Sequence, residues 1–189
     1  MTYSPTVGQT GAGNETLGIT PQAQVAKVQF VIDSHRVTGD LRYGGPPRRL
    51  VDLLNALDGG YATIFNGYLD SPLRPDDERK HFDVAQVRRD AIIYAIPLSG
   101  APAPGSHDES VRKVPARTCL ALPAYDITGY CFHVPDADPA SVSMLSGRNF
   151  VPVTEAVIRP AFQAETVRED IVVVNLARVL VYAPGSQGD

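Results

Sequence analysis

The chain has 189 residues, of which 43% are hydrophobic and 20% are charged, and its formal net charge is −4. This composition is typical of a globular protein with its own core, and the acidic balance excludes a globally basic surface for nucleic acid or an anionic membrane. No apolar run approaches the roughly 20 residues that a membrane-spanning helix needs, so we expect no membrane partner.

Residues 1–24 are rich in glycine and threonine, which predicts a disordered or loosely draped tail. They carry neither a basic start nor an apolar stretch, so no secretory signal is expected. The default expectation is a cytoplasmic protein.

Two stretches of the chain, residues 25–97 and 117–184, show the same order of predicted elements. In the first stretch, a strand hairpin, a short helix, a third strand and a final pair of strands are predicted from "KVQFVIDSHRVTGDLRY", "PPRRLVDLLNALDGG", "YATIFNGYLD" and "FDVAQVRRDAIIYAIP". In the second stretch the matching segments are "RTCLALPAYDITGYCFHV", "DADPASVSMLSG", "RNFVPVTEAVI" and "EDIVVVNLARVLVYAP". Residues 98–116 between them are rich in proline, glycine and serine and predict a linker, and residues 185–189 form a short tail.

Both stretches carry a glycine inside their second strand, Gly39 and Gly129. Glycine within a strand marks a bend or a bulge, and a unit of about 70 residues with a bent strand favours a small barrel closed on itself. We therefore predict a mainly β fold with short helices (α+β), built by tandem duplication of a β-β-α-β-β-β small-barrel unit.

The glycine-containing second strand and the ending "VRRDAIIYAI" resemble the Sm-like small β-barrels. In that family the last turn is typically Ile-Arg-Gly. Here Val87-Arg88-Arg89-Asp90 takes its place, and the second stretch has Val174-Asn175-Leu176-Ala177. Sm-like proteins carry their helix before the first strand, whereas here it follows the second. The segments "VTGDL", "RLVDLLN" and "NFVPVTEA" also resemble an uncharacterised bacterial domain family, which brings no known activity.

The resemblance to Sm-like proteins implies a candidate nucleic-acid or nucleotide site. Sm-like RNA sites use an Asp-x-x-Asn pair and an arginine of the last turn, and the corresponding residues here are Asp52, Asn55, Arg88 and Arg89. The competing interpretation places Asp52 and Asn55 on the polar face of an amphipathic helix and both arginines in an exposed turn. Neither half of the chain is net basic, so nucleic acid is the alternative partner and not the favoured one.

Other signals of chemistry are absent from the sequence. It shows no phosphate-binding glycine loop before a helix, no cluster with metal-ligand spacing and no nucleophile elbow, so we predict no enzymatic activity, no cofactor and no metal. The two cysteines, Cys119 and Cys131, are too few for a disulfide framework. We expect both thiols to be reduced and to face each other across one hairpin centred on Tyr125.

The favoured prediction is a non-catalytic structural or interaction module that self-associates through exposed barrel edge strands. The final strands, "AIIYAI" and "RVLVYA", are apolar and β-branched, and a strand of this kind at a sheet edge invites pairing with another strand. We expect a homo-oligomer, with a protein partner at the same edges as a further option. The candidate interface residues are Ile92, Ile93, Tyr94, Val179, Leu180 and Tyr182.

Overall fold

The computed structural model describes residues 23–46, 48–57, 60–74, 76–99, 113–133, 135 and 149–185. Strands account for 64% of these residues and form one antiparallel sheet in the order β10-β6-β7-β8-β9-β5-β1-β2-β3-β4. The N-terminal half supplies β1 (Gln24–Ile32), β2 (His35–Tyr43), β3 (Tyr61–Asp70), β4 (Lys80–Arg88) and β5 (Tyr94–Ser99). The C-terminal half supplies β6 (Val114–Leu122), β7 (Tyr125–His133), β8 (Phe150–Pro160), β9 (Val167–Asn175) and β10 (Val181–Pro184).

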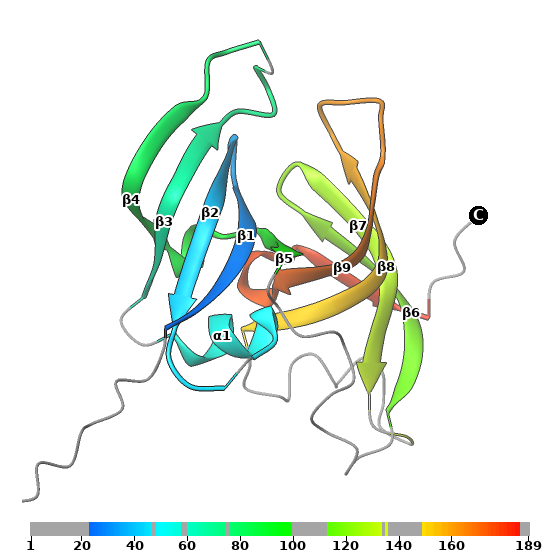
Figure 1. The fold of residues 1–189 in the computed structure, drawn as a ribbon. Coiled ribbons are helices and arrows are strands. Elements are labelled where there is room, and N and C mark those ends of the chain that lie inside the picture. Colours follow the sequence, from blue (N-terminus) through cyan, green and yellow to red (C-terminus); the bar gives the residue numbers. More distant parts are fainter. Residues whose placement is uncertain are drawn as a thin grey trace, which may run out of the picture.

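Three short helical segments accompany the sheet in the described part of the chain. The α-helix α1 (Leu50–Ala56) follows β2, and the 3-10 helices η1 (Arg89–Ala91) and η2 (Leu176–Arg178) precede β5 and β10. Figure 1 shows two curved halves that meet where β5 and β9 run side by side, with α1 below the junction.

The predicted fold class, an α+β tandem of small closed barrels, is wrong. The strands belong to one open sheet whose two edges are β4 and β10, and α1 has only seven residues. The physical reason lies in β5, which pairs with β1 on one side and with β9 of the other half on the other side. It therefore joins the two halves, and β4 is left with no second strand partner among the described residues. The second predicted helix, residues 138–147, lies outside the described residues.

The predicted hairpins are confirmed, and each half contains the same irregularity in its second strand. The pairing of β2 with β3 shifts register at Gly39, and the pairing of β7 with β8 shifts at Gly129. A Cβ atom on Gly129 would lie 2.6 Å from the carbonyl oxygen of Thr154, and one on Gly39 would lie 2.8 Å from that of Phe65. Only glycine lets the backbones approach so closely, which confirms the predicted bulge.

The register of the β6–β7 hairpin corrects the expected position of the thiols. Its turn falls just before Tyr125, so that Cys119 lies opposite Thr128 and Cys131 lies opposite Ala116. The expectation that the two cysteines face each other is therefore wrong. Both are free and half-buried, and burial raises the pKa of the Cys131 thiol.

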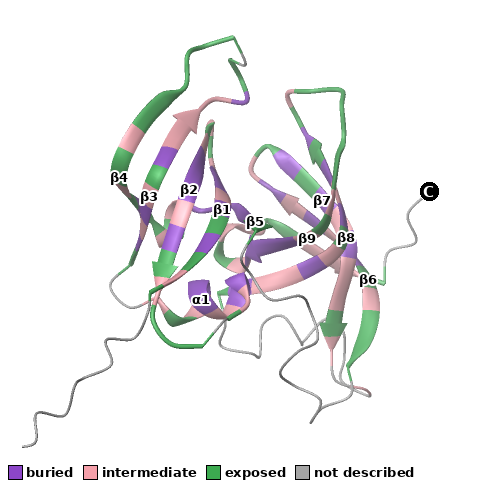
Figure 2. Cartoon of the chain, viewed as in Figure 1, coloured by how far each residue is buried: buried purple, intermediate pink, exposed green. Residues whose placement is uncertain are grey.

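Each half has its own apolar core, which we call the N-terminal core and the C-terminal core. The N-terminal core gathers buried residues such as Phe30, Leu54 and Ile64, and the C-terminal core gathers residues such as Leu120 and Ile127. Figure 2 shows that burial is densest on the strands near the junction and on α1, whereas β4 is largely exposed.

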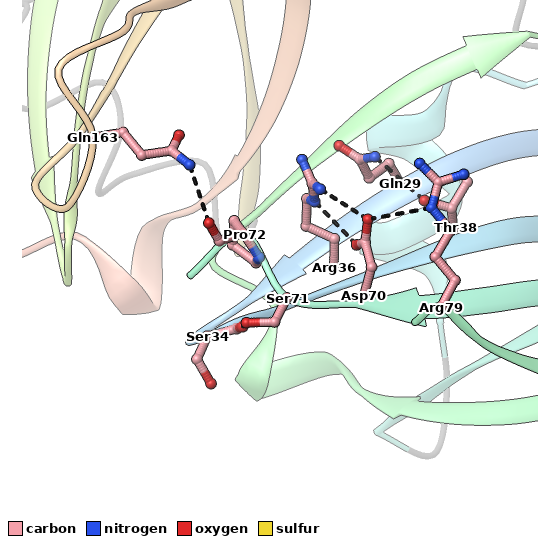
Figure 3. A network of polar contacts seen from close by, with 9 residues as sticks. All are labelled: Gln29, Ser34, Arg36, Thr38, Asp70, Ser71, Pro72, Arg79 and Gln163. Atoms are coloured by element: carbon pink, nitrogen blue, oxygen red, sulfur yellow. Dashed lines mark hydrogen bonds and ion pairs between the residues drawn. The ribbon is translucent and has the colours of Figure 1, made fainter. Parts of the chain in front are cut away.

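Polar contacts between β2, β3 and the β3–β4 loop stabilise the N-terminal half. Asp70, whose side chain is only 10% exposed, accepts two hydrogen bonds from the Arg36 guanidinium, at 3.0 and 2.8 Å. Arg79 adds a second cation at 3.9 Å from the same carboxylate. Nearby, the side-chain amide of Gln163 donates to the carbonyl oxygen of Pro72 at 3.0 Å (Figure 3), so the β8–β9 loop also contacts the β3–β4 loop.

Candidate interaction surface

The junction between the halves is a short antiparallel pairing of β5 with β9. Tyr94 lies opposite Val174, and Ala95 lies opposite Val173. One further backbone hydrogen bond runs from the Asn175 N–H to the Ile93 carbonyl oxygen at 3.0 Å. The contact is thus built from few hydrogen bonds, and side chains have to supply much of its stability.

The two halves exchange apolar side chains across this junction. Phe150 and Val173 come from the C-terminal half but are buried in the N-terminal core, with 0% and 1% exposure. Ile93 and Tyr94 come from the N-terminal half and are buried in the C-terminal core, with 0% and 6% exposure. There the Tyr94 ring meets the Tyr125 ring edge-on, with 5.2 Å between centroids. Each core is therefore completed by residues of the other half.

Asn175 fastens the same junction through its buried side chain. The residue is 1% exposed, and its Nδ2 donates to the carbonyl oxygens of Ile92 at 2.9 Å and Arg89 at 3.3 Å. Its Oδ1 accepts from the Ala177 N–H at 3.1 Å. One amide therefore ties the end of β9 to both 3-10 helices.

The helix α1 also contributes to the junction, through Asn55. Its Nδ2 donates to the carbonyl oxygen of Phe150 at 2.9 Å, and the Phe150 N–H donates to its Oδ1 at 3.0 Å. The side-chain amide thereby pairs with the first residue of β8 as a neighbouring strand would. This contact holds α1 of the N-terminal half against the C-terminal half.

The predicted interface residues separate into two groups. Ile92, Ile93 and Tyr94 are buried inside the chain, with exposures of 0%, 0% and 6%, because β5 lies in the middle of the sheet. The second group, Val179, Leu180 and Tyr182, lies at the β10 edge. Val179 and Tyr182 pack against the C-terminal core, whereas Leu180 is 71% exposed.

The sequence reasoning missed three further exposed apolar residues, two on the edge strands and one on β3 beside the β4 edge. Val181 of β10 is 58% exposed, Val84 of β4 is 55% exposed, and Tyr61 at the start of β3 is 48% exposed. With Leu180, the first two are the most exposed of the large hydrophobic residues in the described part of the chain. Val181 belongs to the apolar segment "RVLVYA" that signalled an edge, but nothing in the sequence distinguished β4 from a covered strand.

Of the four predicted nucleic-acid residues, two are held in ion pairs with near neighbours. Asp52 accepts two hydrogen bonds from Arg49, at 2.8 and 3.1 Å. Arg88 forms a bidentate pair with Asp90, and this hydrogen bond keeps the pKa of the Asp90 carboxyl below its usual range. Both carboxylates therefore reduce the positive potential of the arginine beside them.

The other two, Asn55 and Arg89, lie on either side of Phe150. The Asn55 amide is occupied by the Phe150 backbone, and the Arg89 guanidinium lies over the Phe150 ring, 5.5 Å from its centroid. Arg89 also borders an open hollow of about 240 Å³, next to Tyr61 and Asn149. These contacts give Asn55 and Arg89 structural roles at the junction.

Within the described residues, no group of three or more histidine, cysteine, aspartate or glutamate side chains is arranged to hold a metal ion. None of the described helices is long and apolar enough to cross a membrane. Comparison of the chain with known protein families, with curated proteins and with solved structures found no match.

Proposed function

We propose that this protein is a non-catalytic structural module that self-associates through the two free edges of its sheet, β4 and β10. The observation that carries the proposal is the exposure of Leu180 and Val181, 71% and 58%, at an edge strand. Edge strands present unpaired backbone N–H and C=O groups, and apolar side chains beside them favour the addition of another strand.

Charge on β4 limits where such pairing takes place. Lys80, Asp83 and Arg88 lie on this strand, and charged side chains at an edge discourage pairing. The segment between Asp83 and Arg88 is uncharged and includes the exposed Val84. The proposed contact is therefore short, and its stability comes from apolar burial more than from a long ladder of hydrogen bonds.

Sedimentation velocity of the purified chain tests the proposal directly. We expect species heavier than the 20.3 kDa monomer at concentrations from roughly 1 to 100 micromolar, the range in which contacts of about 5 to 8 kcal/mol are populated. A protein that stays monomeric throughout this range contradicts the proposal. Nucleic acid that copurifies and leaves only in salt, seen as an excess of absorbance at 260 nm, would instead favour the nucleic-acid alternative.

A substitution at the β10 edge identifies the surface responsible. Leu180→Lys should leave the fold intact, because the side chain is 71% exposed in the monomer. It should weaken association by roughly 2 kcal/mol, the benefit of burying one leucine side chain, or about 30-fold in dissociation constant. Leu98→Lys is the matched control, because Leu98 is 46% exposed on β5, a strand in the middle of the sheet. Equal association of the two variants would rule out β10.

A further inference from the structure

We propose that copies of this chain associate head to tail, with β10 of one copy paired antiparallel to β4 of the next. The pairing would follow the register that β5 and β9 use inside the chain. This inference rests on the proposed function and adds which edge meets which. The occupant of each edge is thus a second copy of the same chain, and the model for the contact is the internal junction.

The strands on the two sides of the internal junction have close counterparts at the free edges. The strand order is β5-β1-β2-β3-β4 in one half and β10-β6-β7-β8-β9 in the other. Thus β10 holds the place in its half that β5 holds in the other, and β4 holds the place of β9. The internal junction joins β5 to β9, so the edges left over are the counterparts of a pair that already associates.

Backbone hydrogen bonds show that the residue before β10 is held by its neighbouring strand in the same way as the residue before β5. The Ile93 N–H, just before β5, donates to the Val31 carbonyl oxygen at 2.8 Å. The Leu180 N–H, just before β10, donates to the Ala121 carbonyl oxygen at 2.8 Å. Ile93 then offers its own carbonyl oxygen to β9. Leu180 is the residue in the corresponding place at the free edge.

The ends of β4 and β9 are also held alike. The Arg89 N–H donates to the Gly60 carbonyl oxygen at 2.8 Å, and the Leu176 N–H donates to the Asn149 carbonyl oxygen at 2.7 Å. Each of these hydrogen bonds comes from the first residue after its strand, Arg89 after β4 and Leu176 after β9. The N–H that β9 directs to β5, that of Asn175, therefore has its counterpart in the N–H of Arg88.

Exposure differs most at the positions that the internal junction covers. Ile93 and Tyr94 are 0% and 6% exposed, while their counterparts Leu180 and Val181 are 71% and 58% exposed. On the other side of the contact, Phe150 opens β8 opposite Asn175 and is 0% exposed, whereas Tyr61 opens β3 opposite Arg88 and is 48% exposed. These bare residues are the ones that a second contact of the same kind would bury.

The register of the internal junction specifies the new one. Because Tyr94 lies opposite Val174, Val181 of one copy lies opposite Val87 of the next. Tyr182 then lies opposite Gln86, and the Arg88 N–H points at the Leu180 carbonyl oxygen. Gln86 is the polar member of this set, and it shares its face with the Tyr182 hydroxyl because directly opposed residues project to the same side of a sheet.

A contact of this kind joins two different surfaces and leaves one of each free at the ends of every assembly. Such heterologous contacts produce closed rings when the rotation per copy closes, and filaments when it does not. An isologous contact, β4 on β4 or β10 on β10, would stop at pairs. The two arrangements therefore predict different behaviour when one edge at a time is blocked.

The test uses two variants of the full chain, each blocked at one edge. Leu180→Lys blocks β10. Gln86→Pro blocks β4. The N–H groups of alternate residues point to the same side of a strand, so the Gln86 N–H faces away from β3, as the Arg88 N–H does. Proline there removes an outward donor and leaves the pairing with β3 intact. Circular dichroism melts verify that both variants fold.

Under head-to-tail pairing, each variant alone is monomeric or associates at least roughly tenfold more weakly than wild type. A one-to-one mixture restores a single contact, from β10 of the Gln86→Pro chain to β4 of the Leu180→Lys chain. Sedimentation then shows a heterodimer that neither variant forms alone. Homodimers of either variant, or a mixture that behaves as the sum of its parts, overturn the inference while wild-type association still supports the proposed function. A monomeric wild type removes both.

The register has its own readout. Val87→Cys in one chain and Val181→Cys in the other place two thiols at directly opposed positions without cross-strand hydrogen bonds, where side chains come closest. We expect a mixed disulfide between these two positions under mild oxidation, identified by peptide mass. Both chains also carry Cys119→Ala and Cys131→Ala, because Cys119 lies on the strand beside Val181 and could trap the new thiol within one chain. Failure of the two new cysteines to cross-link in the mixture would overturn the register.

Discussion

Replacing Asn175 with alanine should destabilise the whole sheet, although the residue holds neither charge nor a large apolar surface. The side chain is 1% exposed and forms three hydrogen bonds to backbone atoms at the β5–β9 junction. Alanine removes the donor to the carbonyl oxygen of Ile92, a fully buried residue. It also removes the acceptor of the Ala177 N–H. Each buried group stranded in this way costs about 1–3 kcal/mol, so we expect a total of about 3 kcal/mol.

Thermal unfolding measures this cost. For a chain of this size, each kcal/mol lowers Tm by about 2–4 °C, so Asn175→Ala should melt about 6–12 °C below wild type. Both proteins should carry Leu180→Lys, because association would otherwise add its own concentration-dependent stability. Chemical denaturation on the same background checks that the difference persists at room temperature.

The matched control is Arg88→Ala, at the corresponding place at the end of β4. Arg88 pairs with Asp90, but both side chains are more than half exposed, with 64% and 65% exposure. Water screens an ion pair as exposed as this one, so the variant should melt within about 3 °C of wild type. Similar Tm values for the Asn175 and Arg88 variants would refute the view that the buried amide holds the junction together.

Three further changes test other parts of the fold. Gly129→Ala should cost about 2–4 kcal/mol by calorimetry, because the new Cβ meets a backbone oxygen at 2.6 Å, whereas Gly44→Ala, with open space around it, should change stability by less than about 0.5 kcal/mol. Asp70→Ala should lower the urea midpoint through the loss of about 1–3 kcal/mol, and Asp77→Ala, from an exposed pair at 3.9 Å, should not change it. Burial raises the pKa of the Tyr94 hydroxyl in the folded protein. Above about pH 10 this hydroxyl therefore loses its proton only in the unfolded state, and stability falls with rising pH. Tyr94→Phe should flatten that decline in melts between about pH 8 and 11. Equal melts within any of these pairs, or an unchanged alkaline decline in the phenylalanine variant, would contradict the corresponding account.

Local structure was readable from the sequence wherever short-range rules decide it. The hairpins follow from alternating β-branched and aromatic residues on both sides of a turn, and Gly39 and Gly129 mark the bulges because close backbone approach leaves no room for a Cβ. The exact position of a hairpin turn is harder to predict. A hairpin turn displaced toward Pro123 moved Cys119 and Cys131 three positions apart in register, since every pair in a hairpin depends on its centre.

The open sheet was not readable, because strand pairing is non-local. A closed barrel and a continuous sheet require the same apolar strands in the same order, and they differ only in whether β5 turns to β4 or to β9. The side-chain contacts that decide it come from distant segments: Phe150 inserts into the N-terminal core, and Tyr94 inserts into the C-terminal core. The hydrophobic periodicity of either segment does not indicate which of the two cores will bury its side chain.

The candidate site shows the same limit most clearly in two segments that read alike. "AIIYAI" and "RVLVYA" are both short, apolar and β-branched, and both were predicted as edges. Ile93 of the first is 0% exposed, and Leu180 of the second is 71% exposed. Their chemistry is equivalent, so the difference comes only from the strand that lies beside each one. A segment that is buried when β9 covers it is equally suited to burial when β4 of another copy covers it. Under the proposed head-to-tail contact, such an edge is one half of a junction whose other half lies at the opposite end of the same sheet.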